Sequence, residues 1–276
     1  MKVALVKVLP DSFWTFLSKF SLVRRVRDHA RGNKAFFYFL YGVRGIAKSL
    51  PDGTCVVELD SMTFHLPSMQ QLSVIFEILR ERVYERVYSL RRGYVVIDVG
   101  AHVGVFSVMA ARVIGEDGVV LAIEPEPKNL KFLQENIVTN GVERTVRILR
   151  GAAGREKGKG KLYLSEHSTQ HSFYTRSHVG EYMKDFIEVN VDSLDDIVIN
   201  LGIRKVDFIK IDVQGWELEV LNGMTGILGL PAVNIAIAAY HSLPDGTPEA
   251  PRVINFFESR GVKAVDYKNG FVYAET

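Results

Sequence analysis

The stretch VVIDVGAHVGVF at residues 95–106 decides the fold, because it is an apolar strand that turns at glycines into a helix. In a doubly wound sheet, this first strand-to-helix turn lies in the crevice at the carboxyl ends of the strands, where nucleotides bind. Gly100 and Gly104 let the backbone approach a ligand there. Glu124 ends the next apolar run, and a carboxylate at that strand end can bind both hydroxyls of a ribose. The stretch therefore predicts a site for a cofactor that carries a ribose.

The residue between the two glycines indicates which cofactor this is. A nicotinamide dinucleotide needs a second glycine two positions after Gly100, because its pyrophosphate packs on bare backbone. His102 stands at that position. This favours S-adenosylmethionine, which has no pyrophosphate, over the dinucleotide. Glycines that serve only to pack the strand against the helix are the remaining alternative.

The rest of the chain indicates the fold class. From residue 93 onward apolar strands alternate with helices, which is typical of parallel strands joined by right-handed crossovers. Asn269-Gly270 between the last two apolar runs indicates an antiparallel hairpin. We therefore expect an α/β fold with a doubly wound, mostly parallel seven-stranded sheet that ends in this hairpin. The strands are expected over residues 94–99, 119–124, 145–149, 206–212, 232–239, 262–267 and 271–274.

Two parts are expected: an N-terminal attachment over residues 1–92 and the cofactor-binding domain over residues 93–276. The attachment is predicted to contain helices over 13–23 and 70–89 and a hairpin of 54–59 with 62–66.

An insertion separates the third and fourth strands of the domain. Its residues 161–164 and 186–191 are predicted to be extended, and the glycine- and lysine-rich run 157–161 is predicted to be a solvated turn. His167 and His171 lie in this insertion and are candidates to line an acceptor pocket.

A second motif, VDFIKIDVQGWE at residues 206–217, places three charged groups at the end of an apolar strand. Side chains alternate along a strand, so Lys210 and Asp212 point to the same side. Buried charges are costly unless they are paired, so we expect these two residues to pair with each other at the crevice. Glu217 lies near the start of the next helix, where the helix dipole favours an acid.

Together with the 95–106 stretch and the segment EPEP at 124–127, this motif resembles the FkbM family of S-adenosylmethionine-dependent methyltransferases. The segment VNVDSLDD at 189–196 is also similar, and the resemblance spans residues 93–276. It implies a Rossmann-like class I methyltransferase fold, with transfer of a methyl group to a hydroxyl of a sugar, lipid or small metabolite. This chain departs from the family at 238–239, where alanines replace a glutamate that commonly stands shortly before the histidine of the fifth strand.

Methyl transfer from a sulfonium requires the acceptor oxygen and the methyl carbon to be held in line. A hydroxyl also loses a proton, and an imidazole titrates in a useful range for a base. His241 is therefore the first candidate base and Asp212 the second. Asp212 and Glu217 could instead hold a divalent cation, but the sequence shows no third oxygen ligand, so no metal is predicted.

These arguments define two sets of site residues. The cofactor is expected to contact Asp98, Gly100, Ala101, His102, Gly104, Glu124, Pro125, Ala152 and Ala153. The acceptor is expected to be surrounded by His241, Asp212, Lys210 and Glu217.

Residues 11–48 carry eight Lys or Arg and two Asp, whereas the whole chain has a net charge of only +2. Such a basic segment can be a solvated surface or can attract phosphate groups. Two alternatives to a small-molecule methyltransferase follow. One is an RNA methyltransferase that uses this segment, and the other is a non-catalytic module recruited to membranes by the 13–23 helix. Nucleic acid is disfavoured as a partner. No Asn-Pro-Pro-Tyr type segment follows the fourth strand to hold a flipped base, which argues against methylation of an exocyclic base amine.

The remaining features concern the location of the protein. No apolar stretch reaches the roughly 18 residues that span a bilayer, and the first residues lack a small-residue cleavage site. Cys55 is the single cysteine, so no internal disulfide can form. We therefore expect a cytoplasmic protein, with peripheral membrane contact through residues 11–48 as a possibility.

Overall fold

The computed structural model describes residues 46–165, 168–175, 182–243, 245–266 and 270–276. The chain divides into two compact units, residues 1–73 and 74–276. The helix expected over 13–23, the basic residues that follow it up to residue 45, and Lys268 and Asn269 of the expected hairpin turn lie outside the described residues.

The described part of the first unit contains a three-stranded antiparallel sheet of β1 (Ala47–Ser49), β2 (Cys55–Leu59) and β3 (Met62–Leu66). The predicted hairpin is confirmed. Asp60 and Ser61 form its two-residue turn with φ of +53° and +61°, the backbone that matches the twist of paired strands. Cys55 is fully buried, and burial raises the pKa of its thiol to about 11, so it is not a reactive thiolate.

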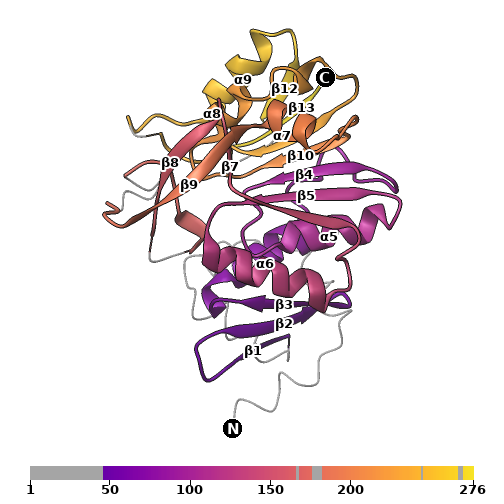
Figure 1. Ribbon diagram of the computed structural model, residues 1–276, viewed down its shortest axis with the longest axis vertical. Helices are drawn as coiled ribbons and strands as arrows, with labels where there is room; N and C mark the ends of the chain where they lie inside the picture. Colours follow the sequence, from indigo (N-terminus) through magenta and orange to yellow (C-terminus); the bar gives the residue numbers. More distant parts are fainter. Residues whose placement is uncertain (1–45, 166–167, 176–181, 244, 267–269) are drawn as a thin grey trace, which may run out of the picture. The chain divides into compact units, whose positions relative to one another are not determined.

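The second unit is built on a mixed sheet that, among the described residues, has seven strands in the order β12-β13-β11-β10-β4-β5-β6 (Figure 1). They are β4 (Val95–Val99), β5 (Val119–Glu124), β6 (Val146–Arg150), β10 (Phe208–Ile211), β11 (Asn234–Ala238), β12 (Lys263–Asp266) and β13 (Phe271–Glu275). Neighbours from β6 to β11 pair in parallel, and β13 is antiparallel to both β11 and β12. The predicted doubly wound sheet with an antiparallel end is confirmed. Its strand order reverses between β4 and β10, which is where such sheets bind ligands.

Helices cover both faces of this sheet. They are α5 (Val105–Ile114), α6 (Pro127–Thr139), α7 (Leu194–Asn200), α8 (Glu217–Asn222) and α9 (Ala250–Glu258). Figure 1 shows α5 and α6 on one face and α7, α8 and α9 on the other. On the second face, alternate strand residues such as Ile97, Ile209 and Ile235 pack with Leu194, Leu221 and Phe257 in one buried core. The opposite set of strand positions includes Asp98 and Lys210, which are therefore on the α5 side of the sheet.

The helix expected over 70–89 is shorter in the structure. It consists of the 3-10 turn η2 (Met69–Gln71), α4 (Leu72–Ile75) and the π-helical turn η3 (Phe76–Arg80). Arg82 has a φ of +49°, a left-handed conformation that does not continue a right-handed helix. Val83 and Tyr84 are then buried, so tertiary packing overrides the helical pattern of the sequence.

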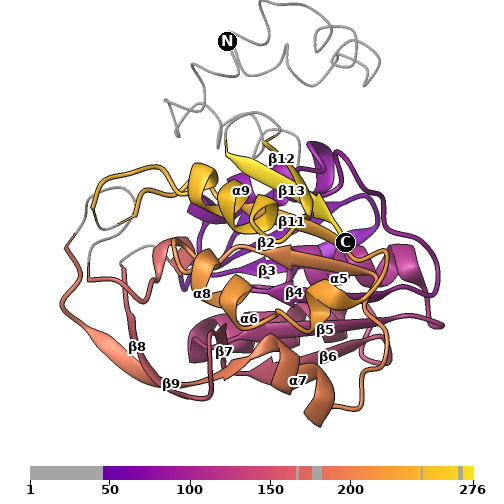
Figure 2. The same cartoon turned by 90° about the horizontal axis from the view of Figure 1, so that it is seen from above.

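The insertion contributes a second sheet, in the order β7-β9-β8 (Figure 2). Its strands are β7 (Ala152–Gly154), β8 (Gly158–Tyr163) and β9 (Phe186–Ser193), and the short 3-10 turns of the unit are η4 (Ser168–Gln170) and η5 (Ile227–Gly229). The extended segments are confirmed, but the turn predicted over 157–161 is wrong, because most of it pairs with β9. A Cβ on Gly160 would lie 2.5 Å from the Phe173 ring, so this glycine serves packing and not turn formation.

Candidate active site

Two glycines in the turn after β4 are required by close packing. Gly100 has a φ of +76°, and a Cβ there would lie 2.0 Å from the backbone oxygen of Asp212 at the end of β10. Gly104 begins α5 with a φ of +83°, and a Cβ there would lie 2.4 Å from Leu133 of α6. The first glycine therefore lets the ends of β4 and β10 meet at the point where the strand order reverses.

Glu124, at the end of β5, fastens this turn to the start of α6. Its Oε2 accepts a hydrogen bond from the backbone N–H of His102 at 2.8 Å. Its Oε1 accepts from the N–H of Glu126 at 3.0 Å and from Asn129 Nδ2 at 3.2 Å. Burial raises the pKa of Glu124 to about 7, although these three hydrogen bonds oppose the shift. Its charge therefore changes near neutral pH.

His102 stands in the middle of the turn with a φ of +53°, which is uncommon for a residue other than glycine. Burial and then the charge of Lys210 lower the pKa of its imidazole to about 3. His102 is therefore neutral, and it adds no positive charge where a sulfonium is expected.

Lys210 does not pair with Asp212, so that expectation is wrong. Its Nζ lies 3.0 Å from Oδ1 of Asp98 and donates a hydrogen bond to the backbone oxygen of Gly100 at 2.7 Å. Ser107 donates to the other oxygen of Asp98 at 2.6 Å. The physical reason is register: Lys210 stands directly beside Asp98 in the parallel pair β4–β10, whereas Asp212 lies beyond the end of β10.

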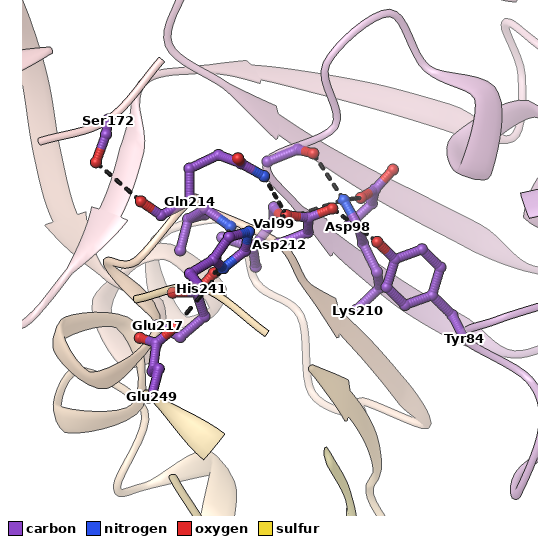
Figure 3. A network of polar contacts seen from close by, with 12 residues as sticks. Tyr84, Asp98, Val99, Ser172, Lys210, Asp212, Gln214, Glu217, His241 and Glu249 are labelled. Atoms are coloured by element: carbon purple, nitrogen blue, oxygen red, sulfur yellow. Dashed lines mark hydrogen bonds and ion pairs between the residues drawn. The ribbon is translucent and has the colours of Figure 1, made fainter. Parts of the chain in front are cut away.

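Asp212 is held from two sides, as Figure 3 shows. Tyr84 donates its hydroxyl hydrogen to Oδ2 at 2.7 Å, and Gln214 Nε2 donates to Oδ1 at 2.7 Å. Ser172 of the insertion donates in turn to the backbone oxygen of Gln214 at 2.8 Å. The side chain of Asp212 remains 19% exposed, whereas those of Glu217 and His241 are fully buried. Asp212 is therefore the acid of this group that an incoming molecule can contact.

His241, just after β11, lies among three carboxylates (Figure 3). Its Nδ1 is 3.1 Å from Glu217 Oε1 and 3.6 Å from Glu249 Oε2, and its Nε2 is 3.9 Å from Asp212 Oδ1. Glu217 also accepts a hydrogen bond from the N–H of Val213 at 3.0 Å. The sequence predicted Glu217 beside this histidine but did not predict Glu249.

The electrostatics of this group follow from burial and mutual charge. Burial alone lowers the pKa of His241, but the charge of Glu217 and its hydrogen bond raise it to about 10. Burial, followed by the charge of Glu217, raises the pKa of Glu249 to about 9. Burial acts in the same direction on Glu217, but His241 outweighs it, so the pKa of Glu217 is lowered. At neutral pH Glu249 is therefore protonated beside an ion pair of His241 and Glu217.

The structure brings most of the predicted site residues to one edge of the sheet, at the carboxyl ends of β4, β5, β10 and β11. Three others follow the carboxyl ends of β5 and β6, and their contacts are with other parts of the unit. Pro125 lines a cavity of about 790 Å³ beside α6 and β6, Ala152 packs within the small sheet, and Ala153 packs within the main core. Their assignment to the cofactor stays a prediction.

The histidines of the insertion have no demonstrated part in this group. His171 accepts a hydrogen bond on Nδ1 from the backbone N–H of Ser165 at 3.0 Å, which is a structural contact within the insertion. His167 lies outside the described residues.

Two contacts escaped prediction for different reasons. Tyr84 reaches Asp212 from 128 positions away in the chain, and no local pattern marks it. Glu249 is the N-cap residue of α9, a position where the helix dipole favours an acid whatever its other contacts are. Its backbone N–H donates to the oxygen of His241 at 3.1 Å, which aims it at the imidazole. Glu249 thus supplies an acid beside the histidine where the strand itself has alanines.

The fold and this edge of the sheet define a class I methyltransferase with S-adenosylmethionine as its cofactor. Residues 98–264 match the methyltransferase FkbM domain, which is more than half of the chain, and the protein belongs to this family.

Individual relatives are distant. The chain is 27% identical over 222 residues to the 31-O-demethyl-FK506 methyltransferase FkbM of Streptomyces tacrolimicus, covering 70% of this chain and 81% of that protein. It is 24% identical over 198 residues to the methyltransferase sdnD of Sordaria araneosa, covering 61% and 75%. The crystal structure of a methyltransferase FkbM from Methylobacillus flagellatus KT matches with a TM-score of 0.46 and 19% identity, covering 75% of this chain and 54% of that chain.

One further observation concerns membranes. Within the ranges that the structure describes, no helix combines the length and the apolar character that crossing a bilayer requires.

Proposed function

We propose that this methyltransferase methylates a hydroxyl oxygen of a small or lipid-linked, carbohydrate-like acceptor. The observation that carries the proposal is the partly exposed carboxylate of Asp212, which Tyr84 and Gln214 orient at the end of β10. A carboxylate in this position can accept the proton that a hydroxyl loses on methylation. The name of the Streptomyces relative, which specifies an O-methyl position, supports the same reaction type.

On this proposal the cofactor supplies an activated methyl group on a sulfonium, and the chain supplies position and a base. Glu124 binds the ribose, and the turn from Asp98 to Gly104 shapes the methionine side. The acceptor oxygen forms the new bond to the methyl carbon as the carbon–sulfur bond breaks, and Asp212 takes the hydroxyl proton. We assign the base to Asp212 and not to His241, because the imidazole is fully buried.

Lys210 and His241 have supporting parts in this scheme. Lys210 neutralises Asp98 and donates a hydrogen bond to the carbonyl of Gly100, so it stabilises the turn after β4. His241 and Glu217 hold the loop that follows β10, which carries Asp212. Both act through neighbours and not on the reacting atoms.

A methyl-transfer screen tests the proposal. The protein is incubated with methyl-labelled S-adenosylmethionine and cell extract that has been separated into lipid, glycan, small-molecule and RNA fractions. We expect label in a lipid, glycan or small-molecule fraction, bound as an ether that survives mild base. Label in RNA alone, with binding that falls steeply with salt, would instead support the RNA alternative.

Glu124 predicts how cofactor binding depends on pH. Three of the four acceptor positions of the ionised carboxylate are taken by His102, Glu126 and Asn129, and the fourth, on Oε2, can accept a hydrogen bond from a ribose hydroxyl. The protonated form loses acceptor capacity. With a pKa of about 7, the ionised fraction rises between pH 6 and pH 8. We expect the affinity for S-adenosylhomocysteine to increase about tenfold over this interval, measured by calorimetry.

The control for this prediction is Glu124→Gln, which keeps the size of the side chain and cannot ionise. We expect its affinity to be weaker at pH 8 and to lose most of the rise. A rise of the same size in the glutamine variant would show that a different group titrates.

A further inference from the structure

The side chains of Asp212, Glu217 and His241 have the spacing of a metal site. They come from three segments, the end of β10, the start of α8 and the residues after β11. One ligand atom from each lies within 4.8 Å of the others. Ligand atoms about 2.1 Å from an octahedral cation are about 3 to 4.2 Å apart, so small side-chain shifts would place all three on one ion.

Glu249 is a second, independent observation at the same place. Its side chain is fully buried, and in the described part of the chain neither of its oxygens accepts a hydrogen bond of normal length, the imidazole of His241 being 3.6 Å from Oε2. Oε2 of Glu217 is likewise buried and accepts no hydrogen bond among the described residues. A buried carboxyl oxygen without a partner is costly, and a bound cation would be such a partner.

The described ion pairs do not provide these carboxyl oxygens with a lysine or arginine partner. Lys210 on β10 pairs with Asp98 and donates to the carbonyl of Gly100. Among the described residues, the ion pairs of Glu217 and Glu249 are both with His241. One imidazole therefore faces the carboxyl groups of Asp212, Glu217 and Glu249, which together offer several oxygens to a cation.

We infer that Asp212, Glu217 and His241 bind a divalent cation of the Mg²⁺ and Mn²⁺ class, with the carboxyl group of Glu249 behind the ligands. The ion replaces a proton on the imidazole, which is released to solvent. Carboxylate oxygens select these hard cations, and a single imidazole nitrogen is compatible with Mn²⁺. The sequence argument against a metal was the lack of a third oxygen ligand, and the structure brings a nitrogen ligand, His241, to this place instead.

The site also deepens the proposed function, and this part of the inference rests on it. A cation bound at Oδ1 of Asp212 lies at the partly exposed end of the cluster, where the acceptor must approach. It would take the acceptor oxygen as a ligand and ease the loss of the hydroxyl proton, as bound metal ions do for water. Tyr84 would keep its hydrogen bond to Oδ2.

Manganese titration tests the site without any need for activity. The full chain is treated with a chelator, desalted and titrated with Mn²⁺, and free Mn²⁺ is followed by electron paramagnetic resonance. We expect one saturable Mn²⁺ per chain that Mg²⁺ displaces. Asp212→Asn and Glu217→Gln should each weaken Mn²⁺ binding by about 10- to 100-fold.

The matched control is Glu219→Gln, on the same helix as Glu217. The carboxylate of Glu219 bonds Arg155 at the surface, so its loss should leave Mn²⁺ binding unchanged. Because Glu217 also holds the N–H of Val213, its variant could unfold, and Asp212→Asn then decides the question.

The outcomes separate this inference from the proposed function. A chain that binds S-adenosylhomocysteine but no Mn²⁺, or whose Mn²⁺ binding survives both substitutions, overturns the metal site and leaves methyl transfer to a hydroxyl standing. Saturable Mn²⁺ binding that depends on Asp212, together with no label in any hydroxyl-bearing fraction, supports the site and contradicts the proposed acceptor class.

Discussion

Replacing Asp212 by asparagine should lower the rate of methyl transfer by about 10²- to 10⁴-fold, the usual contribution of a positioned base. The asparagine keeps the size of the side chain and can still contact Tyr84 and Gln214, so the loop should remain folded. The measurement is single-turnover transfer of labelled methyl to the acceptor found in the screen. Affinity for S-adenosylhomocysteine should change little.

Tyr84→Phe is the matched control for this prediction. It removes one hydrogen bond to Asp212 and leaves the carboxylate in place, so the loss should be only about 2- to 13-fold, equivalent to 0.5 to 1.5 kcal/mol. A turnover rate for Asp212→Asn as close to the parent as that of Tyr84→Phe would rule out Asp212 as the base.

Replacing Lys210 by methionine should destabilise the fold by about 3 to 5 kcal/mol, because it leaves the carboxylate of Asp98 buried without its counter-charge. Equilibrium unfolding in urea measures this loss. The second substitution, Asp98→Asn in the same chain, should restore part of it, since a neutral amide is less costly to bury than an unpaired carboxylate.

Arg155→Met provides the comparison at the surface. Arg155 and Glu219 form an exposed ion pair, and such pairs contribute about 0 to 1 kcal/mol. If Lys210→Met costs no more than Arg155→Met, the buried pair is not what holds β4 and β10 together at the cofactor turn.

Much of the fold is predictable because it depends on local patterns. Alternating apolar runs and the glycines at 100 and 104 mark the strand, turn and helix, and the acid at 124 marks the end of the next strand. Each of these signals lies within a few residues of the structure that it predicts. The antiparallel end of the sheet was likewise visible from two adjacent apolar runs.

The site was only partly predictable, because its contacts depend on which strands become neighbours. Lys210 could be seen to face the crevice, but its partner Asp98 follows from the placement of β10 beside β4, which a single strand cannot reveal. Tyr84 looked like part of a continuing helix, and Glu249 looked like a residue at a helix start. Gly160 looked like a turn residue, because the Phe173 ring that excludes a side chain there is distant in sequence.

The hydrogen bond from Ser172 to the backbone of Gln214 has an evolutionary consequence. It requires only a hydroxyl on the donor side, since the acceptor is main chain that every sequence possesses. The segment between β8 and β9 is therefore constrained at position 172 by the need for a hydroxyl, and at Phe173 and Tyr174 by the contacts of their rings with Trp216.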